Sequence, residues 1–341
     1  MKYVTFLSLT GSPAPRWGVV LGETVVDLQA AQDWARGTRG LQAEWLPDSL
    51  LGLIQGGPSV WAYARALIDA LAGEDPLGLR GAGQQAVGLP LAQVRLLPPL
   101  SHPPSVRDFY AFEQHVRTVN ANRGSEVPPE WYEFPVFYFT NPHAIFGPDD
   151  EIPHPQATRA LDYELEIACV IGLAGKDIPP DQAEEHIFGY MILNDWSARD
   201  VQRKEMRVGL GPAKGKDFAT SLGPWLVTPD ELSDRKTPRP GVYDLEMVAR
   251  VNGVERSRGN FKEIHYSFGD LIARASADTV LQPGDLLGSG TVGTGCLLEL
   301  TRGEGPWLQA GAIVELEIER LGVLRNQVAG TTPQDQIPHV G

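Results

Sequence analysis

The segment from Asp162 to Gly172 constrains the fold of this chain more than any other stretch of the sequence. Acidic and apolar side chains alternate at its start, which is the period-two pattern of a β-strand with two unlike faces. Glu164 and Glu166 therefore project from one face, about 7 Å apart at a rise of roughly 3.3 Å per residue. The residues after Glu166 are continuously apolar, so we expect the second half of this strand to be buried.

Two interpretations of the acidic face stay open on this pattern. Neighbouring carboxylates beside a hydrophobic core repel each other unless a cation lies between them, which would make Glu164 and Glu166 a pair of metal ligands. The other interpretation is an edge strand whose polar face is solvated.

The composition narrows the class of protein. Of the 341 residues, 42% are hydrophobic and 21% are charged, as in an ordinary globular protein. The formal net charge of −14 argues against nucleic acid or an anionic membrane surface as a partner, because either would require a basic surface. No segment has the apolar length that a membrane span needs, and the sequence does not start with a long apolar run. We therefore expect a cytoplasmic enzyme with a small-molecule substrate.

The cysteine content is low, with two residues that lie far apart in the sequence, Cys169 and Cys296. Cys169 falls in the apolar half of the strand, where a buried free thiol is expected. Neither the number nor the spacing of the cysteines supports a disulfide framework or a thiolate metal site.

Strand and helix patterns divide the chain into two predicted units. Residues 1–97 mix short strand patterns with helical ones and predict a small N-terminal α+β cap domain. The proline-rich residues 98–104 cannot continue a helix or a central strand, and they form the predicted linker. Residues 105–329 contain many strand patterns, including a pair between residues 284 and 300, and form the predicted catalytic domain, which is mainly β. The polar residues 330–341 are predicted to be a flexible tail.

Four carboxylates stand out by their context: Asp108, Glu164, Glu166 and Asp195. A set of oxygen ligands without cysteine suits a hard ion such as Mg²⁺, Mn²⁺ or Ca²⁺, and it suits zinc less well. The pattern alone does not show that the four residues converge. Asp108 could instead cap the helix that follows it, and a lone histidine on that helix, His115, is more often a surface or core residue than a catalyst.

Five blocks of sequence occur in a fixed order between residues 105 and 325. They are Arg107-Asp108-Phe109-Tyr110 with Gln114-His115; Asp162 to Glu166; Asn194 to Gln202; Gly215 to Phe218 before Pro224-Trp225; and Pro283 to Gly293 before Leu298-Glu299-Leu300. Together these blocks resemble the signatures of the fumarylacetoacetate hydrolase family.

The resemblance implies a fold and a set of site residues that periodicity could not supply. The implied fold is mainly β with α (α+β), a mixed β-sandwich roll with a small N-terminal α+β domain, in a homodimer. The implied cofactor is one divalent cation, with Mg²⁺ favoured and Mn²⁺ or Ca²⁺ as alternatives. Its ligands would be Asp108, Glu164, Glu166 and Asp195.

The resemblance also assigns roles around that ion. His115 matches the general base, because a neutral imidazole can take a proton from water near pH 7. Glu299 matches the carboxylate that orients this imidazole. The other matched positions, which contact substrate or stabilise an oxyanion, are Tyr110, Arg199, Gln202, Lys216 and Thr291. Residues 117–139 do not align one by one, so Arg123 and Tyr138 are candidate substrate contacts only. Lys214 near Lys216 leaves open which amine faces the site.

These roles favour a hydrolase that cleaves the carbon–carbon bond of a β-diketo acid such as fumarylacetoacetate or an acylpyruvate, as in the catabolism of aromatic amino acids. The alternatives are an isomerase or decarboxylase of a 2-oxo or 2-hydroxydienoate diacid, or an oxaloacetate decarboxylase. A protein that binds an oxo-acid without catalysis is a further alternative. Without the family blocks, Lys216 would be interpreted as a surface lysine and Arg199 as part of an ion pair at a helix end.

Overall fold

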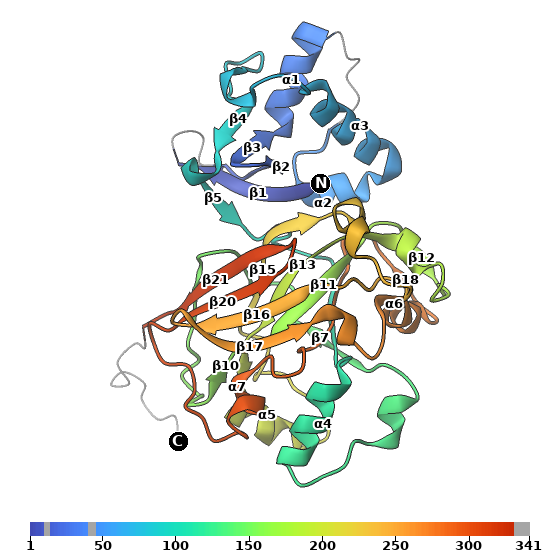
Figure 1. The fold of residues 1–341 in the computed structure, drawn as a ribbon, viewed down its shortest axis with the longest axis vertical. Coiled ribbons are helices and arrows are strands. Elements are labelled where there is room, and N and C mark those ends of the chain that lie inside the picture. Colours follow the sequence, from blue (N-terminus) through green and yellow to red (C-terminus); the bar gives the residue numbers. More distant parts are fainter. Residues whose placement is uncertain (10–13, 40–45, 331–341) are drawn as a thin grey trace, which may run out of the picture.

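A large mixed β-sheet forms the centre of the computed structural model, which describes residues 1–9, 14–39 and 46–330 (Figure 1). Its strands follow the order β4-β3-β2-β1-β15-β13-β11-β19-β6-β7, with β5 beside β1 and β8 beside β15. The predicted flexible tail lies outside the described residues, apart from Gly330.

In its described residues, the N-terminal part contributes five strands and three helices, drawn in blue and teal at the top of Figure 1. They are β1 (Lys2–Ser8), β2 (Arg16–Leu21), β3 (Thr24–Asp27), α1 (Leu28–Arg39), α2 (Leu50–Gln55), α3 (Gly57–Ala70), β4 (Gly88–Pro90) and β5 (Val94–Leu97). Strand β1 pairs with β15 (Thr220–Val227) through Lys2↔Val227 and Tyr3↔Leu226. The sheet therefore continues across the predicted linker at residues 98–104, and the division into two domains stays a prediction.

The acidic segment lies in the middle of this sheet. Strand β11 (Leu165–Ile171) pairs on one side with β13 (Ile187–Asp195) and on the other with β19 (Leu286–Gly288). Every residue of β11 is buried. The interpretation of the segment as a solvated edge strand is therefore wrong.

The predicted single strand over 162–172 is in fact two pieces. Leu161–Asp162 form β10, which pairs with β14 (Ser197–Ala198) away from the central sheet, and β11 starts only at Leu165. At the break, the backbone N–H of Glu164 donates to Oδ1 of Asn194. Asp162 thus ends one strand and Glu164 precedes the next, so strict alternation does not describe their relation.

A second sheet packs against one face of the central sheet, and α2 and α3 cover the other face, so both faces of β11 are buried. It has the order β17-β16-β20-β21-β9, and its strands are β17 (Val254–Asn260), β16 (Glu246–Val251), β20 (Ile313–Ile318), β21 (Gly322–Val328) and β9 (Glu151–Ile152). Ile167 of β11 belongs to one core with Met247 and Leu316 of this second sheet. Its neighbour Ala168 belongs to another core, with Leu53 and Leu67 of α2 and α3.

Four helices complete the second unit: α4 (Glu113–Asn122), α5 (Arg199–Met206), α6 (Phe268–Ser276) and α7 (Leu297–Leu300). Helices α4, α5 and α7 lie at the end of the molecule opposite the N-terminal part (Figure 1). The residues of α7 were expected to form the second of two strands between 284 and 300. That expectation is wrong, because the backbone N–H groups of Leu297 and Leu298 donate to the carboxylate of Asp162 at the start of a helical turn.

The remaining elements are short. They are β6 (Val106–Phe109), β7 (Phe137–Thr140), β8 (Ile145–Phe146), β12 (Gly175–Lys176), β18 (Val280–Leu281), and 3₁₀ turns at Pro76–Gly78, Leu91–Gln93, Pro129–Tyr132, Ala183–His186, Pro229–Arg235 and Phe261–Glu263. The predicted fold class, a mixed β architecture with helices and an N-terminal α+β part, is confirmed. Within the described ranges, no helix is long and apolar enough to cross a membrane.

Candidate metal centre and active site

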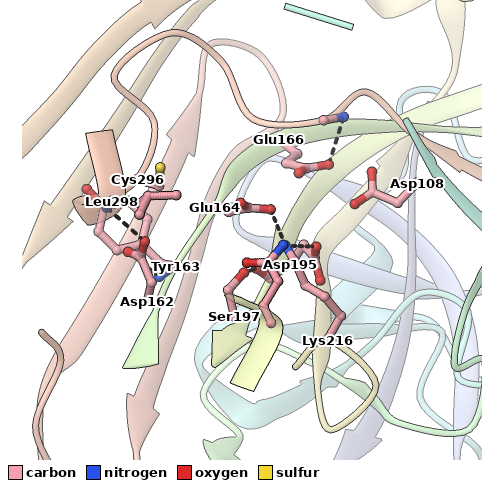
Figure 2. A network of polar contacts seen from close by, with 12 residues as sticks. Asp108, Asp162, Tyr163, Glu164, Glu166, Asp195, Ser197, Lys216, Cys296 and Leu298 are labelled. Atoms are coloured by element: carbon pink, nitrogen blue, oxygen red, sulfur yellow. Dashed lines mark hydrogen bonds and ion pairs between the residues drawn. The ribbon is translucent and has the colours of Figure 1, made fainter. Parts of the chain in front are cut away.

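The four carboxylates singled out in the sequence converge in the structure. Each offers an oxygen, and these oxygens all lie within 4.8 Å of one another. Asp108 lies in β6, and Asp195 is the last residue of β13. Glu166 lies in β11, and Glu164 is the residue directly before β11. All four side chains are buried, and Figure 2 shows them facing a common centre.

The chemistry of this cluster fits a bound dication. Asp108 Oδ1, Glu166 Oε1 and Asp195 Oδ1 are buried and have no hydrogen-bond partner among the described residues. Burial and repulsion from Asp108, Glu164 and Asp195 raise the pKa of Glu166 well above its usual range. A cation at the centre would supply the missing partners and offset the repulsion, as hard oxygen-ligated ions do.

Lys216 reaches into the cluster from the loop before β15. Its Nζ lies 2.6 Å from Oε2 of Glu164 and also pairs with Asp195. Burial alone would lower the pKa of the ammonium, but Asp195 and Glu164 raise it above its usual value. Lys214 instead projects outward and pairs with Asp217, so Lys216 is the amine that faces the site.

Tyr138 also contacts the carboxylates. Its hydroxyl lies within hydrogen-bond distance of Oδ2 of Asp108, at 3.0 Å, and of Oδ2 of Asp195, and its single proton can be donated to either carboxylate. Burial, Asp195 and Asp108 raise the pKa of this phenol well above its usual value, so it stays a neutral donor. The structure therefore brings Tyr138, a candidate substrate contact, into direct contact with two candidate metal ligands.

His115 and Glu299 meet from two helices. Nδ1 of His115 in α4 lies 2.8 Å from Oε2 of Glu299 in α7, and both residues are buried. The ring of Tyr110 meets the imidazole edge-on, with ring centroids 5.3 Å apart. Glu299 also accepts a hydrogen bond of 3.7 Å from the thiol of Cys296.

Arg199 contacts both Asp162 and the carboxylate cluster. Its Nε donates to Oδ2 of Asp162 at 2.8 Å, and its Nη1 lies 2.8 Å from Oε1 of Glu164. Nη1 also donates to Oε1 of Gln202, one turn further along α5. Nη2 of Arg199 is buried without a partner among the described residues, so it remains available to an anionic ligand.

Asp162 is a site residue that sequence analysis missed. Besides holding Arg199, it accepts backbone hydrogen bonds of 2.8 Å from Leu297 and 3.0 Å from Leu298 (Figure 2). Its place on the acidic face of the predicted strand was the available signal. Because no metal-ligand position of the family matched it, the pattern gave it no role.

Sequence analysis also missed Gly288, the last residue of β19, and Gly290 just after it. A side chain on Gly288 would collide with Oδ1 of Asp108 and lie 3.2 Å from Oε2 of Glu166. Gly290 has a φ of +77° and donates its N–H to Oε2 of Glu166 at 3.0 Å. Glycine within a strand pattern signals a close approach of backbone, which here is the approach to two carboxylates.

One cavity of about 330 Å³ joins these groups. It is lined by eleven of the thirteen residues proposed from the sequence: Asp108, Tyr110, His115, Arg123, Tyr138, Glu164, Glu166, Arg199, Gln202, Lys216 and Thr291. Asp195 and Glu299 lie behind this lining and contact Lys216 and His115. Met206, Leu210 and Val136 add apolar walls toward the exterior. A cavity of this size suits a small organic acid.

Comparison with known proteins gives consistent matches. The model of the fumarylacetoacetate (FAA) hydrolase C-terminal family matches residues 105–329. Fumarylacetoacetase from Bos taurus is 31% identical over 347 residues, which cover 86% of this chain and 82% of the relative. Oxaloacetate tautomerase YisK from Bacillus subtilis is 29% identical over 91% of this chain and 94% of the relative.

A solved structure agrees with both. The fumarylacetoacetate hydrolase from the psychrophile Exiguobacterium antarcticum superimposes with a TM-score of 0.69 and 28% sequence identity, covering 97% of this chain and 100% of that one. The relatives thus include a hydrolase and a tautomerase.

Proposed function

Because the chain belongs to the fumarylacetoacetate hydrolase family, whose members include hydrolases, isomerases and tautomerases, we propose that it is a hydrolase of the carbon–carbon bond of a β-diketo acid. The observation that carries this proposal is the His115–Glu299 pair, 2.8 Å apart, with His115 facing the same cavity as the carboxylate cluster. A base beside the cavity is what activation of a water requires, whereas tautomerisation alone needs no water.

Asp108, Glu164, Glu166 and Asp195 would hold the divalent cation, with Mg²⁺ favoured for an all-oxygen set and Mn²⁺ or Ca²⁺ as alternatives. When bound, the ion would supply Lewis-acid stabilisation of the enolate that leaves when the bond breaks.

His115 acts as the general base. Since Nδ1 faces Glu299, the other ring nitrogen, Nε2, is the one that takes the proton from water. Glu299 holds the ring and stabilises the imidazolium that forms. The water oxygen bonds to the acyl carbon, the carbon–carbon bond breaks, and its electron pair leaves with the methylene carbon as an enolate. The proton held by His115 is then available to that carbon.

The cationic groups bind and orient the acid. The buried Nη2 of Arg199 has no partner in the described structure, so a substrate carboxylate or oxyanion would satisfy it. Lys216 holds Glu164 and Asp195 in place and offers positive charge at the same point of the cavity. Tyr110, Gln202, Thr291 and Arg123 line the cavity as further polar contacts.

A second candidate function is tautomerisation or isomerisation of an oxo-acid. The match to oxaloacetate tautomerase over 94% of its length favours it. This reaction moves a proton on and off the methylene carbon and uses no water as a nucleophile, so His115 would be dispensable or would act on carbon only. Decarboxylation of oxaloacetate is a related outcome at the same site.

A substrate panel separates these functions. Fumarylacetoacetate, an acylpyruvate and oxaloacetate are each incubated with the Mg²⁺-loaded chain, and products are followed by NMR. We expect carbon–carbon cleavage of a β-diketo acid, and its loss when a chelator removes the metal. Enol–keto exchange without cleavage for every member of the panel would refute the hydrolase and support the tautomerase.

A variant tests the base. We expect His115→Ala to lower hydrolysis at least about 100-fold, the contribution typical of general base catalysis. His143→Ala, at an exposed histidine outside the cavity, is the matched control and should keep full activity. Hydrolysis by His115→Ala at the rate of this control would refute the mechanism.

The proposed homodimer, cytoplasmic location and role in aromatic amino acid catabolism stay predictions. Light scattering on the purified chain tests the homodimer.

A further inference from the structure

The neighbourhood of the His115–Glu299 pair holds a third metal-ligating side chain, the thiol of Cys296. Ligand atoms of His115, Cys296 and Glu299 all lie within 4.8 Å of one another, and the three residues are buried. The other cysteine, Cys169, lies in β11 and is buried in the hydrophobic core. The proposed hydrolysis gives Cys296 no role.

The spacing of these atoms resembles the edges of a metal tetrahedron. Nδ1 of His115 lies 2.8 Å from Oε2 of Glu299, and Sγ of Cys296 lies 3.7 Å from the same oxygen. In a tetrahedral zinc site, with Zn–N and Zn–O near 2.0 Å and Zn–S near 2.3 Å, neighbouring ligand atoms are roughly 3.3 to 3.6 Å apart. The distance between His115 and Glu299 would lengthen by about half an ångström, the distance between Cys296 and Glu299 already matches this spacing, and the ligand atoms of His115 and Cys296 lie within 4.8 Å of each other.

Two polar atoms of the trio make no well-formed hydrogen bond, although Nδ1 of His115 lies 2.8 Å from Oε2 of Glu299. Nδ1 of His115 and Oε1 of Glu299 are buried and have no hydrogen bond of acceptable geometry with the described residues. Buried polar groups of this kind cost free energy unless a proton, an ion or another ligand satisfies them. A cation between the imidazole and the carboxylate would satisfy both.

We infer that His115, Cys296 and Glu299 form a second metal site, selective for a borderline-soft dication such as Zn²⁺, and that filling it stops the proposed reaction. Nitrogen, sulfur and oxygen ligands together suit Zn²⁺, whereas the nearby cluster of four carboxylates suits a hard ion. The bound ion takes the place of the proton between Nδ1 and Glu299, so it withdraws the base from catalysis. Inhibition rests on the proposed function, but binding does not.

The charges around the thiol also favour a cation. Burial raises the pKa of Cys296, and the carboxylates of Asp162, Glu299 and Glu164 raise it further against the opposing effect of Arg199. Of these groups, Glu299 is in direct contact with the thiol. The metal must displace the thiol proton, which further selects an ion with strong affinity for thiolate over Mg²⁺.

Cobalt spectroscopy tests binding without any assay of activity. Co²⁺ is added to the Mg²⁺-saturated protein, and the absorption of a thiolate-to-cobalt charge-transfer band is recorded. We expect the band in the unmodified protein and its loss in Cys296→Ser, which keeps a hydrogen-bonding group beside Glu299, and in Cys296→Ala. Cys169→Ala, the control at the other cysteine, and Glu166→Gln, which alters the carboxylate cluster, should both retain the band. Its absence from the unmodified protein, or its persistence in both Cys296 variants, would refute the site.

Zinc titration tests the effect on turnover. Hydrolysis by the Mg²⁺-loaded protein is measured against buffered Zn²⁺, and each variant is normalised to its own rate without zinc. We expect Cys296→Ser to need at least about tenfold more Zn²⁺ for half-inhibition, the cost of losing one ligand group. Equal sensitivity of Cys296→Ser and the unmodified protein would show that zinc acts at the carboxylates instead. A protein that binds Co²⁺ through Cys296 but hydrolyses none of the panel would refute the proposed function and leave this site standing.

Discussion

Nε of Arg199 donates to Oδ2 of Asp162 over 2.8 Å, in an interior where both side chains are almost fully buried. The same carboxylate accepts the backbone N–H groups of Leu297 and Leu298. Asp162 thereby ties α5, which carries Arg199, to α7, which carries Glu299. Asp162 therefore holds the start of the helical turn that carries Glu299.

The first prediction concerns this buried anion. Asp162→Asn should lower the free energy of unfolding by about 1–3 kcal/mol, because it removes one of the two carboxylates that pair with the buried guanidinium of Arg199 and leaves only Glu164. Urea denaturation of the metal-free protein measures the change. Asp149→Asn is the matched control, since Asp149 forms an exposed ion pair of 2.8 Å with Arg325 and should cost no more than about 1 kcal/mol. Equal losses in the two variants would contradict a structural role for Asp162.

The second prediction concerns the metal at the carboxylate cluster. Mg²⁺ or Mn²⁺ at about 100 times its dissociation constant should stabilise the protein by roughly 2.7 kcal/mol, because the ion binds only the folded chain. Thermal denaturation with and without the ion measures this gain. In Glu166→Gln the gain should fall to near zero, since Glu166 is the most enclosed of the four carboxylates. Undiminished stabilisation by metal in that variant would place the ion elsewhere.

The third prediction tests the backbone that approaches the cluster. Gly288→Ala should weaken metal binding by about tenfold or more, because the added methyl group collides with Oδ1 of Asp108 and displaces this carboxylate. Calorimetric titration of Mg²⁺ or Mn²⁺ into the metal-free protein gives the affinity. Gly37→Ala serves as control: Gly37 lies in α1 with open space around its Cα, so metal affinity should not change. Unaltered affinity in Gly288→Ala would show that the cluster can move aside.

The sequence predicted the parts of the site that depend on local pattern. Alternation placed Glu164 and Glu166 together. The apolar run after them predicted a buried strand, and β11 is in fact covered on both faces. Asp108 and Asp195 stood out by their context, and the family resemblance assigned them to the same ion as Glu164 and Glu166, a connection that alternation could not make. The family and the fold class are confirmed, while the catalytic roles of His115 and the other site residues stay predictions.

The parts that sequence analysis missed depend on contacts between distant segments. Asp162 bonds to Leu297 and Leu298, 135 and 136 residues away, and no local pattern encodes that pairing. The same bonds turn Leu298 to Leu300 into a helix, although their alternation is typical of a strand. Spacing along the chain also concealed Cys296, which lies beside Glu299 only once α7 has formed.

The last prediction concerns pH and the contact between α3 and the 3₁₀ turn at Pro229–Arg235. Nη2 of Arg65 in α3 lies 2.7 Å from Oδ2 of Asp230, a half-exposed carboxylate. Burial alone would raise the pKa of Asp230, but a hydrogen bond from Thr228, the α-ammonium of Met1 and Arg65 lower it to about 2. This value lies below the ordinary one of about 3.9 for an unfolded chain, so the folded state favours the ionised form.

Because the pKa of Asp230 is lower in the folded state than in the unfolded chain, ionised Asp230 stabilises the folded protein. The stabilisation by Asp230 is fully present well above pH 4 and is lost as the pH falls from about 4 toward 2, where the folded protein also takes up the proton. Solvent screening limits it to about 1 kcal/mol or less. Urea denaturation at several pH values, in a double-mutant cycle of Arg65→Met and Asp230→Asn, measures the coupling directly. We expect a coupling that is constant from pH 7 to 5 and falls toward zero as the pH drops through about 2. A coupling that grows on acidification would mean that Asp230 gains its proton on folding, contrary to the ion pair that joins α3 to this turn.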